Sequence, residues 1–219
     1  MHQRYTADTT DYTGRVTVPV LWDKKLSRIV SNESAEIIRM FNSAFNELTG
    51  NTLDLYPASL RPTIEALNAR IYPAVNNGVY RAGFATTQDA YEAAFDDVFN
   101  ELDYLEALLG RNRYLAGEYL TEADVRLFTT LVRFDAVYHG HFKCNLRRLS
   151  DYHNLSNWLR ELYQWPGVAG TVDMEHIQKH YYMSHKTINP NGIVPKGPLQ
   201  DFGLPHDRER LVGKGIWQA

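Results

Sequence analysis

The stretch Val16–Phe45 constrains the fold most, because a strand pattern there gives way directly to a helix pattern. Two short apolar runs flank a polar turn, which predicts a β-hairpin. The first run alternates at the strand period through Val16, Val18, Val20 and Trp22, and the second is Arg28–Val30. The polar side chains of Asn32–Ser34 then offer acceptors for the first N–H groups of a helix. Its apolar side holds Ile37, Ile38, Phe41 and Phe45.

Pro19 interrupts the strand pattern of this stretch. Proline donates no backbone hydrogen bond, so it favours an edge or irregular position whose neighbouring polar groups are free for a ligand. The free N–H groups at the start of the next helix, around Glu33 and Ser34, form a partial positive end that would hold a carboxylate. The two features predict a site for an extended, peptide-like anion. Val18 would pair with its backbone, and Glu33 with Ser34 would bind its ends.

Three collinear segments resemble one family. VPVLWD followed by NESAEIIRMFN, then Tyr138–Tyr152, then His176–Pro198, are similar to the S-glutathionyl-hydroquinone reductases, the Xi-class, omega-like branch of the glutathione transferases. The resemblance covers nearly the whole chain. It implies a mainly α fold, with an all-helical glutathione transferase C-terminal domain preceded by the C-terminal half (β-β-α) of a thioredoxin-like α/β domain. It further implies a cis peptide bond before Pro19, glutathione paired with Val18, and its γ-glutamyl group on Glu33 and Ser34.

The same resemblance divides the chain into three parts. Residues 1–48 correspond to a partial thioredoxin-like, glutathione-binding domain, residues 49–200 to the helical domain, and residues 201–219 to an irregular tail. Met1–Gly14 has no clear period and is expected to form a loop or a frayed end. The front of the thioredoxin-like domain, with the Cys-Pro turn that carries the family's nucleophile, is expected to be absent. We therefore expect a truncated form without the catalytic cysteine.

The helical part is predicted from apolar periodicity and turn signals. The longest helix, Gln88–Leu109, begins after Thr86 or Thr87 and ends at Gly110. Dense turn signals predict a break at Tyr72–Gly78. Other helices are expected at Ser59–Ala69, Val125–His139, Leu155–Tyr163 and Val172–Tyr182. The core face of the long helix is predicted to hold Ala90, Ala94, Val98, Leu102, Leu105 and Leu109. Its solvent face is predicted to hold Glu92, Asp96, Asp97, Glu101, Asp103 and Glu106.

Thr121 and Asp124 form the clearest local motif, a capping box at the start of a helix. The Thr121 hydroxyl can accept from the N–H of Asp124, while the Asp124 carboxylate reaches back to the N–H of Thr121. Similar boxes occur in the core helix of glutathione transferases. We therefore assign these two residues a structural role.

Tyrosines are the candidate groups for a quinol substrate, because a phenol combines a ring that stacks with a hydroxyl that donates a proton. The resemblance implies an aromatic acceptor pocket built by tyrosines of the helical domain, and most of the 14 tyrosines remain compatible with ordinary packing. The pocket is assigned to Tyr72, Tyr138, Tyr181 and Tyr182, and the possible proton donors are Tyr72, Tyr181 and Tyr182.

The single cysteine and the histidines give weaker signals. Lys143, Arg147 and Arg148 could lower the pKa of Cys144, but no Cys-Pro turn surrounds it, so a structural thiol is favoured. His176 and His180 share a helix face without further ligands, and we expect no metal.

Composition sets the remaining limits. The chain has 219 residues, a net charge of −3 and 44% hydrophobic residues, which excludes an electrostatic case for nucleic acid or an anionic membrane. No apolar run reaches membrane-spanning length, and one cysteine fits a reducing compartment, so we expect a cytoplasmic protein.

The resemblance implies glutathione-dependent reduction of S-glutathionyl-hydroquinones to hydroquinones through a mixed disulfide. Glutathione would be the co-substrate, aromatic quinol conjugates the other substrate, and a homodimer the assembly. The alternative is a non-catalytic binding or interaction module of the glutathione transferase type.

Overall fold

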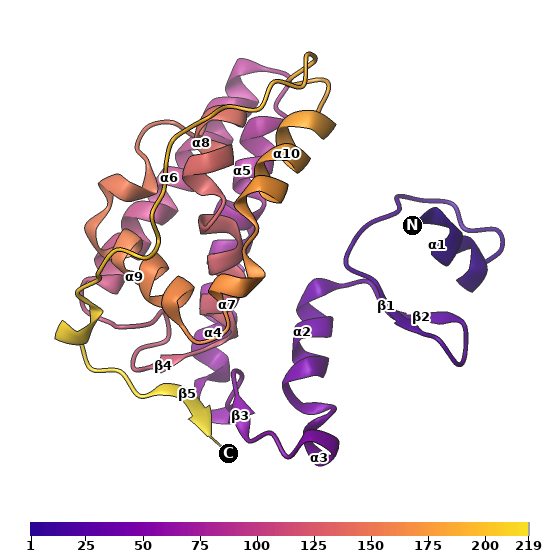
Figure 1. The fold of residues 1–219 in the computed structure, drawn as a ribbon, viewed down its shortest axis with the longest axis horizontal. Helices are drawn as coiled ribbons and strands as arrows, with labels where there is room; N and C mark the ends of the chain where they lie inside the picture. Colours follow the sequence, from indigo (N-terminus) through magenta and orange to yellow (C-terminus); the bar gives the residue numbers. More distant parts are fainter. Residues whose placement is uncertain (219) are drawn as a thin grey trace. The chain divides into compact units, whose positions relative to one another are not determined.

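The computed structural model describes residues 1–218, and the chain divides into two compact units (Figure 1). The first unit comprises Met1–Tyr56 and Gln218, and the second comprises Pro57–Trp217. The division therefore lies after Tyr56, whereas the sequence placed a boundary after residue 48. Residues 201–217, predicted to be a separate tail, belong to the second unit.

The first unit contains the predicted hairpin and helix. Strands β1 (Leu21–Asp23) and β2 (Arg28–Ser31) pair antiparallel, with Trp22 opposite Ile29, and helix α2 (Ser34–Ser43) follows. The strand is shorter than its apolar pattern, since Val16–Val20 lies outside β1. The peptide bond between Val18 and Pro19 is cis, as the resemblance implied. The unit ends with α3 (Asn46–Thr49) and β3 (Leu53–Asp54).

The prediction of a loop at Met1–Gly14 is wrong, because residues His2–Asp8 form helix α1. So short a helix is unstable alone, and tertiary contacts hold it. The ring of Tyr5 is buried, and its hydroxyl donates to the carbonyl of Thr17 over 2.9 Å. The Asp8 carboxylate accepts from the N–H of Ile29 over 2.8 Å. Neither contact produces a periodic pattern of apolar residues in the sequence. The helix could therefore not be predicted from periodicity.

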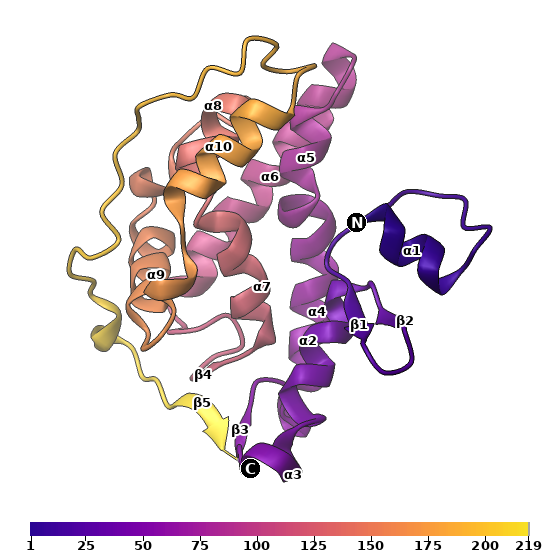
Figure 2. The ribbon, with the colours of Figure 1, turned by 45° about the vertical axis from the view of Figure 1, so that its right-hand side comes forward.

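The second unit is a bundle of helices (Figure 2). Helix α6 spans the predicted Gln88–Leu109, and the Thr87 hydroxyl accepts from the N–H of Ala90 over 3.3 Å. The other predicted helices occur within a few residues of their expected bounds, except that the predicted Val125–His139 is divided into α7, η3 and α8. The elements are η1 (Ala58–Leu60), α4 (Arg61–Ile71), α7 (Glu122–Leu131), η3 (Phe134–Tyr138), α8 (His139–His141), η4 (Leu149–Asp151), α9 (His153–Gln164), η5 (Ala169–Thr171) and α10 (Met174–Ser184).

The predicted break at Tyr72–Gly78 is also wrong. This segment is helical, with a π-helical turn η2 (Tyr72–Asn76) leading into α5 (Gly78–Gly83). The glycines serve close packing rather than a turn. A Cβ at Gly78 would lie 2.9 Å from Val98, and one at Gly83 would lie 2.2 Å from the Phe142 ring. Absence of a side chain thus lets α5 approach its neighbours.

The C-terminal segment is more ordered than the predicted irregular tail. Figures 1 and 2 show it running from the end of α10 past α9 to η6 (Arg208–Arg210) and β5 (Gly215–Gln218). Strand β5 pairs in parallel with β4 (Tyr119–Leu120). The buried guanidinium of Arg208 fixes the segment by donating to the carbonyls of Leu109, Asn112 and Arg113 over 2.6 to 2.8 Å.

Two predictions about the faces of α6 need correction. Ala90, assigned to the core face, is exposed near the helix start. Glu101, assigned to the solvent face, is buried and pairs with Arg70 over 2.9 Å. Glu106 is half-buried and accepts from the N–H groups of Asn154 and Leu155 at the start of α9, over 2.9 and 2.8 Å. Carboxylates on this helix therefore bind neighbouring elements, which periodicity cannot foresee.

The capping box is confirmed, and Asp124 does more than the motif requires. Its fully buried carboxylate accepts from the N–H of Thr121 over 3.0 Å, from the N–H of Leu115 over 2.9 Å and from the indole N–H of Trp158 over 3.0 Å. Burial raises the pKa of Asp124, and these hydrogen bonds oppose that shift by favouring the carboxylate. One side chain thus joins the loop after α6, the start of α7 and helix α9.

We expect Asp124→Ala to lower the free energy of unfolding by about 3 kcal/mol, because three buried donors lose their acceptor. Asp151 likewise accepts from the backbone N–H three residues earlier, that of Arg148, over 2.9 Å but is exposed, so Asp151→Ala is the matched control, with a loss below about 1 kcal/mol. Urea unfolding of both variants measures the difference. Equal losses would contradict the role assigned to Asp124.

Candidate functional site

The predicted glutathione-binding residues all lie in the first unit and are exposed. Val18 is 70% exposed, in the loop before β1, and Pro19 follows it. Glu33 and Ser34 lie at the start of α2, where Glu33 is the N-cap residue. The hydroxyl of Tyr5 contacts both Thr17 and Asn32, which directly precede these two pairs. The loop and the helix start therefore lie close to a common side chain.

The start of α2 is capped differently from the prediction. Among the described residues, the side chains of Asn32–Ser34 do not accept from the first N–H groups of the helix. Instead, the Ser31 hydroxyl accepts from the N–H of Glu33 over 3.1 Å and donates to the Glu36 carboxylate over 2.9 Å. Within residues 1–218 the Glu33 carboxylate has no ion-pair partner. The helix start thus retains an exposed carboxylate, an exposed hydroxyl and unpaired first-turn N–H groups, which suit a zwitterionic ligand.

Three tyrosines of the second unit form a chain of hydroxyl groups. Tyr138 (η3) lies 2.9 Å, oxygen to oxygen, from Tyr181 (α10), whose hydroxyl also contacts that of Tyr80 (α5). Exposure rises along the chain, from 2% for Tyr138 through 7% for Tyr181 to 37% for Tyr80. The phenols thus lead from the core to the surface of the bundle.

Either oxygen of each pair can be the donor, because every phenol hydroxyl both donates and accepts. Burial raises the pKa of Tyr138 and of Tyr181, so both remain protonated near neutral pH. Tyr80 is the most exposed of the three, so its phenol is the one most accessible to a ligand.

The other two predicted pocket residues are placed differently. Tyr72 is half-exposed, with the guanidinium of Arg126 5.6 Å from its ring centre. Tyr182 is buried, and its hydroxyl approaches the carbonyl of Ala136 at 3.5 Å.

Tyr80 was not predicted from the sequence, because it follows Asn76–Gly78, which were interpreted as a turn. The one available signal was an aromatic residue two positions after Gly78.

Histidines lie beside the tyrosine chain but do not gather around a metal position. His141 Nε2 is 3.1 Å from His185 Nδ1, and a bond between two imidazoles requires at least one of them neutral. Burial, with the charges of His185 and Lys143, lowers the pKa of His141 to about 4. His176 and His180 stack edge to face. Across the described residues, no three potential metal-binding side chains cluster.

Cys144 lies inside the bundle, fully buried behind η3. Burial raises the pKa of its thiol to about 12, and the nearby Lys143 only partly opposes this. Only a thiolate is an effective nucleophile, so an inaccessible, protonated thiol cannot attack a substrate. The structural assignment of Cys144 follows from its position.

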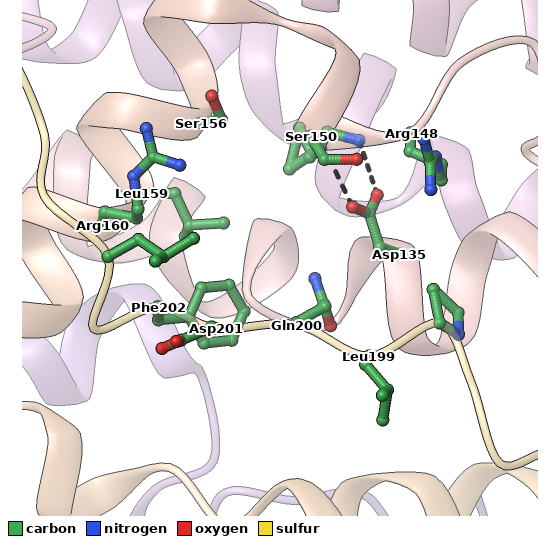
Figure 3. A pocket seen from close by; sticks show the side chains of 13 residues that line it. Asp135, Arg148, Ser150, Ser156, Leu159, Arg160, Leu199, Gln200, Asp201 and Phe202 are labelled. Atoms are coloured by element: carbon green, nitrogen blue, oxygen red, sulfur yellow. Dashed lines mark hydrogen bonds between the residues drawn. The ribbon is translucent and has the colours of Figure 1, made fainter.

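The second unit also has a cavity of about 170 Å³ between η4, α9 and the C-terminal segment, which Figure 3 shows. Asp135 points to its wall, where the carboxylate accepts from the N–H groups of Leu149 and Ser150 over 2.5 and 3.2 Å. Arg148 pairs with Asp151 over 3.0 Å, and Arg160 donates to Asn157 over 2.8 Å. Asp135 and Arg148 thus already have partners in the protein, whereas Arg160 Nε and Gln200 Oε1, which are buried in the lining, have none among the described residues.

Comparison with known proteins identifies the class. Residues 88–161 match the family model for the glutathione S-transferase C-terminal domain. The glutathione-bound structure of YqjG, a glutathione transferase homologue from Escherichia coli, is 59% identical, with a TM-score of 0.93 over 95% of this chain and 68% of that one. The glutathione S-transferase Xi of Phanerochaete chrysosporium is 55% identical, with a TM-score of 0.90 over 94% of this chain and 70% of that one.

The chain therefore belongs to the glutathione transferase family, in its Xi class. The predicted fold class, a helical C-terminal domain preceded by a β-β-α part of a thioredoxin-like domain, is confirmed.

Two relatives carry a more specific name. YqjG of Escherichia coli, a glutathionyl-hydroquinone reductase, is 58% identical over 213 residues, covering 97% of this chain and 65% of the relative. The glutathionyl-hydroquinone reductase PcpF of Sphingobium chlorophenolicum is 57% identical over 200 residues, covering 91% of this chain and 64% of the relative. The chain thus spans slightly less than two thirds of the length of these relatives.

We expect Cys144 to resist thiol reagents in the folded chain, because a pKa of about 12 leaves a thiolate fraction of about 1 in 10,000 at pH 8. Reaction should become fast only in denaturant. Val212→Cys, at a 68% exposed position, provides a reactive control in the same protein. Labelling of native Cys144 at the rate of the control would refute its structural assignment.

Proposed function

We propose that this chain supplies the glutathione-binding segment and the quinol-binding helical domain of a glutathionyl-hydroquinone reductase. The observation that carries the proposal is the identity of 58% and 57% with two proteins of that name. The exposed helix start at Glu33–Ser34 supports the glutathione part of the proposal, and the partly exposed Tyr80 supports the quinol part. The substrate is glutathione joined through sulfur to a hydroquinone ring.

The reaction balances in two steps, and in each of them a thiolate attacks a sulfur atom. A cysteine thiolate attacks the sulfur of the conjugate, an S–S bond to glutathione forms, and the bond from sulfur to the ring carbon breaks. The electron pair stays on the ring carbon, which takes up a proton to give hydroquinone. A second glutathione then attacks the mixed disulfide, releasing glutathione disulfide and restoring the thiol. Since Cys144 is buried, we assign the attacking thiolate in this proposal to a cysteine other than Cys144.

Glutathione is assigned to the first unit. The backbone of Val18, next to Pro19, would pair with the peptide of glutathione. Glu33 would bind the γ-glutamyl ammonium group, and the Ser34 hydroxyl with the first N–H groups of α2 would bind its carboxylate. These are charge-assisted contacts, which are the strong ones in a partly exposed site.

The quinol is assigned to the tyrosine chain of the second unit. Tyr80 would donate to an oxygen of the ring, stabilising the charge that develops as the bond from carbon to sulfur breaks, and Tyr181 would support Tyr80 through their shared hydrogen bond. Tyr181 is also a proton donor in this proposal, and Tyr138 lies behind it. Tyr72 and Tyr182 remain proposed as further aromatic residues of the pocket and as alternative proton donors.

A non-catalytic binding module is the second candidate, and one observation favours it. The only thiol of the chain, Cys144, is buried with a raised pKa, so the 219 residues contain no competent nucleophile. The same two sites would then bind glutathione conjugates without turnover.

Further features of the proposal follow the family. We propose a homodimer in the cytoplasm with glutathione as co-substrate and without a metal. In the described part of the chain, no helix is long and apolar enough to cross a bilayer.

The deciding experiment is the release of hydroquinone from glutathionyl-hydroquinone, with glutathione as reductant. It is run on the chain joined to the thioredoxin-like front segment of a relative, with and without its cysteine. Cysteine-dependent release supports the reductase. Saturable binding without release would favour the binding module, and failure of both would remove the whole proposal.

We expect Glu33→Ala and Ser34→Ala each to weaken glutathione binding by about 1 to 3 kcal/mol, the usual range for a lost contact to a charged group. Titration calorimetry measures the loss. Glu47 lies in the first turn of α3 and is also acidic, so Glu47→Ala is the control and should leave the affinity unchanged. Unaltered affinity in the first two variants would mean that the site is misassigned.

We expect Tyr80→Phe to lower kcat for hydroquinone release by about 100-fold, because the terminal donor of the phenol chain is lost. Tyr163→Phe is a matched control, since the Tyr163 ring packs on Phe202 away from the chain of hydroxyls. Steady-state kinetics of both variants decide the matter. A kcat for Tyr80→Phe equal to that of the control would exclude Tyr80 from the reaction.

A further inference from the structure

The proposed glutathione site is built from two separate segments of the first unit. Val18 and Pro19 lie in the loop before β1, whereas Glu33 and Ser34 begin α2. A tripeptide bound by both segments is held at its backbone by one and at its γ-glutamyl end by the other. The affinity therefore depends on the distance and angle between the segments as well as on their own groups.

One buried side chain bridges these segments. The Tyr5 hydroxyl donates to the carbonyl of Thr17 over 2.9 Å and accepts from the N–H of the same residue over 3.3 Å. It also accepts from the Asn32 side-chain amide over 3.2 Å. Thr17 directly precedes Val18, and Asn32 directly precedes Glu33. A single oxygen thus contacts the residue before each half of the site.

We propose that Tyr5 is a positioning residue of the glutathione site, whose hydroxyl fixes the Val18–Pro19 loop relative to the start of α2. This inference rests on the proposed function for its ligand. Its geometry is a property of the chain alone.

Ring burial by itself does not account for a tyrosine here. The ring of Tyr5 is 2% exposed and packs against Tyr12 at 4.9 Å between centres, which a phenylalanine would equally provide. The hydroxyl adds the hydrogen bonds to Thr17 and Asn32. Both of these residues are exposed. Without these hydrogen bonds, the Val18–Pro19 loop and the start of α2 would each form hydrogen bonds with water instead.

A second contact ties α1 to the sheet without touching the site. The Asp8 carboxylate accepts from the N–H of Ile29 in β2, and it has no contact with Thr17 or Asn32. Asp8→Ala therefore loosens the attachment of the helix while leaving the bridge between the segments in place. It is the matched control for a purely structural effect.

The first test is the affinity of the full chain for glutathione, measured by titration calorimetry well below the unfolding temperature. We expect Tyr5→Phe to raise Kd about tenfold, as expected for the loss of a hydrogen bond that orders the site. Asn32→Ala should also raise the Kd for glutathione. Asp8→Ala should leave the Kd within about twofold of the wild-type value. Equal increases in Tyr5→Phe and Asp8→Ala would overturn the inference, since the effect would then be stability alone.

The second test needs no ligand and so separates this inference from the proposed function. Residual dipolar couplings of the N–H groups of residues 15–18 and of residues 31–43 report the angle between the two segments, because this number of couplings over-determines one alignment tensor. We expect one alignment tensor to fit both in the wild-type chain and in Asp8→Ala, but not in Tyr5→Phe. A single tensor for Tyr5→Phe would overturn the positioning role. If the wild-type chain fails to bind glutathione while the couplings change as expected, the proposed ligand is wrong and the positioning role stands.

Discussion

The carboxylate of Asp124 is the interaction on which the second unit depends. It sits fully buried and accepts from the backbone of Leu115 and Thr121 and from the indole of Trp158. Because a buried charge is tolerated only with such partners, the three segments that supply them must meet at this point. The loop after α6, the start of α7 and helix α9 are thereby fixed around one carboxylate, and the tyrosine chain joins the later elements η3 and α10 to the earlier helix α5.

Much of this architecture could be predicted where the signal is local. The hairpin, the long helix and the capping box of Thr121 and Asp124 follow from alternation, periodicity and cap chemistry within a few residues. Helix α1 could not be predicted, since the contacts of Tyr5 and Asp8 that hold it come from residues far along the chain. Glycines were the other source of error, because at α5 they permit close packing, although their spacing resembles a turn.

The candidate site shows the same limit. Glu33, Ser34 and Pro19 are marked by local chemistry, and the resemblance to the family gave them a ligand. Tyr80 and the bridging role of Tyr5 depend on which hydroxyl groups meet in space, and no spacing in the sequence encodes that. The same holds for Glu101, whose place on a helical wheel suggests solvent, although Arg70 of a neighbouring helix covers it. Pairing across elements is thus the part of the site that needed a structure.

The contact between Gly83 and Phe142 ties the volume of one residue to the geometry of the phenols. The Phe142 ring fills the space that any side chain at position 83 would occupy, and its other face stacks on Tyr138 at 5.4 Å with 12° between the planes. A bulkier residue at position 83 would push this ring toward Tyr138 and shift the innermost hydroxyl. Substitutions at positions 83 and 142 should therefore be correlated. A larger residue at position 83 would be accepted only together with a smaller side chain at position 142.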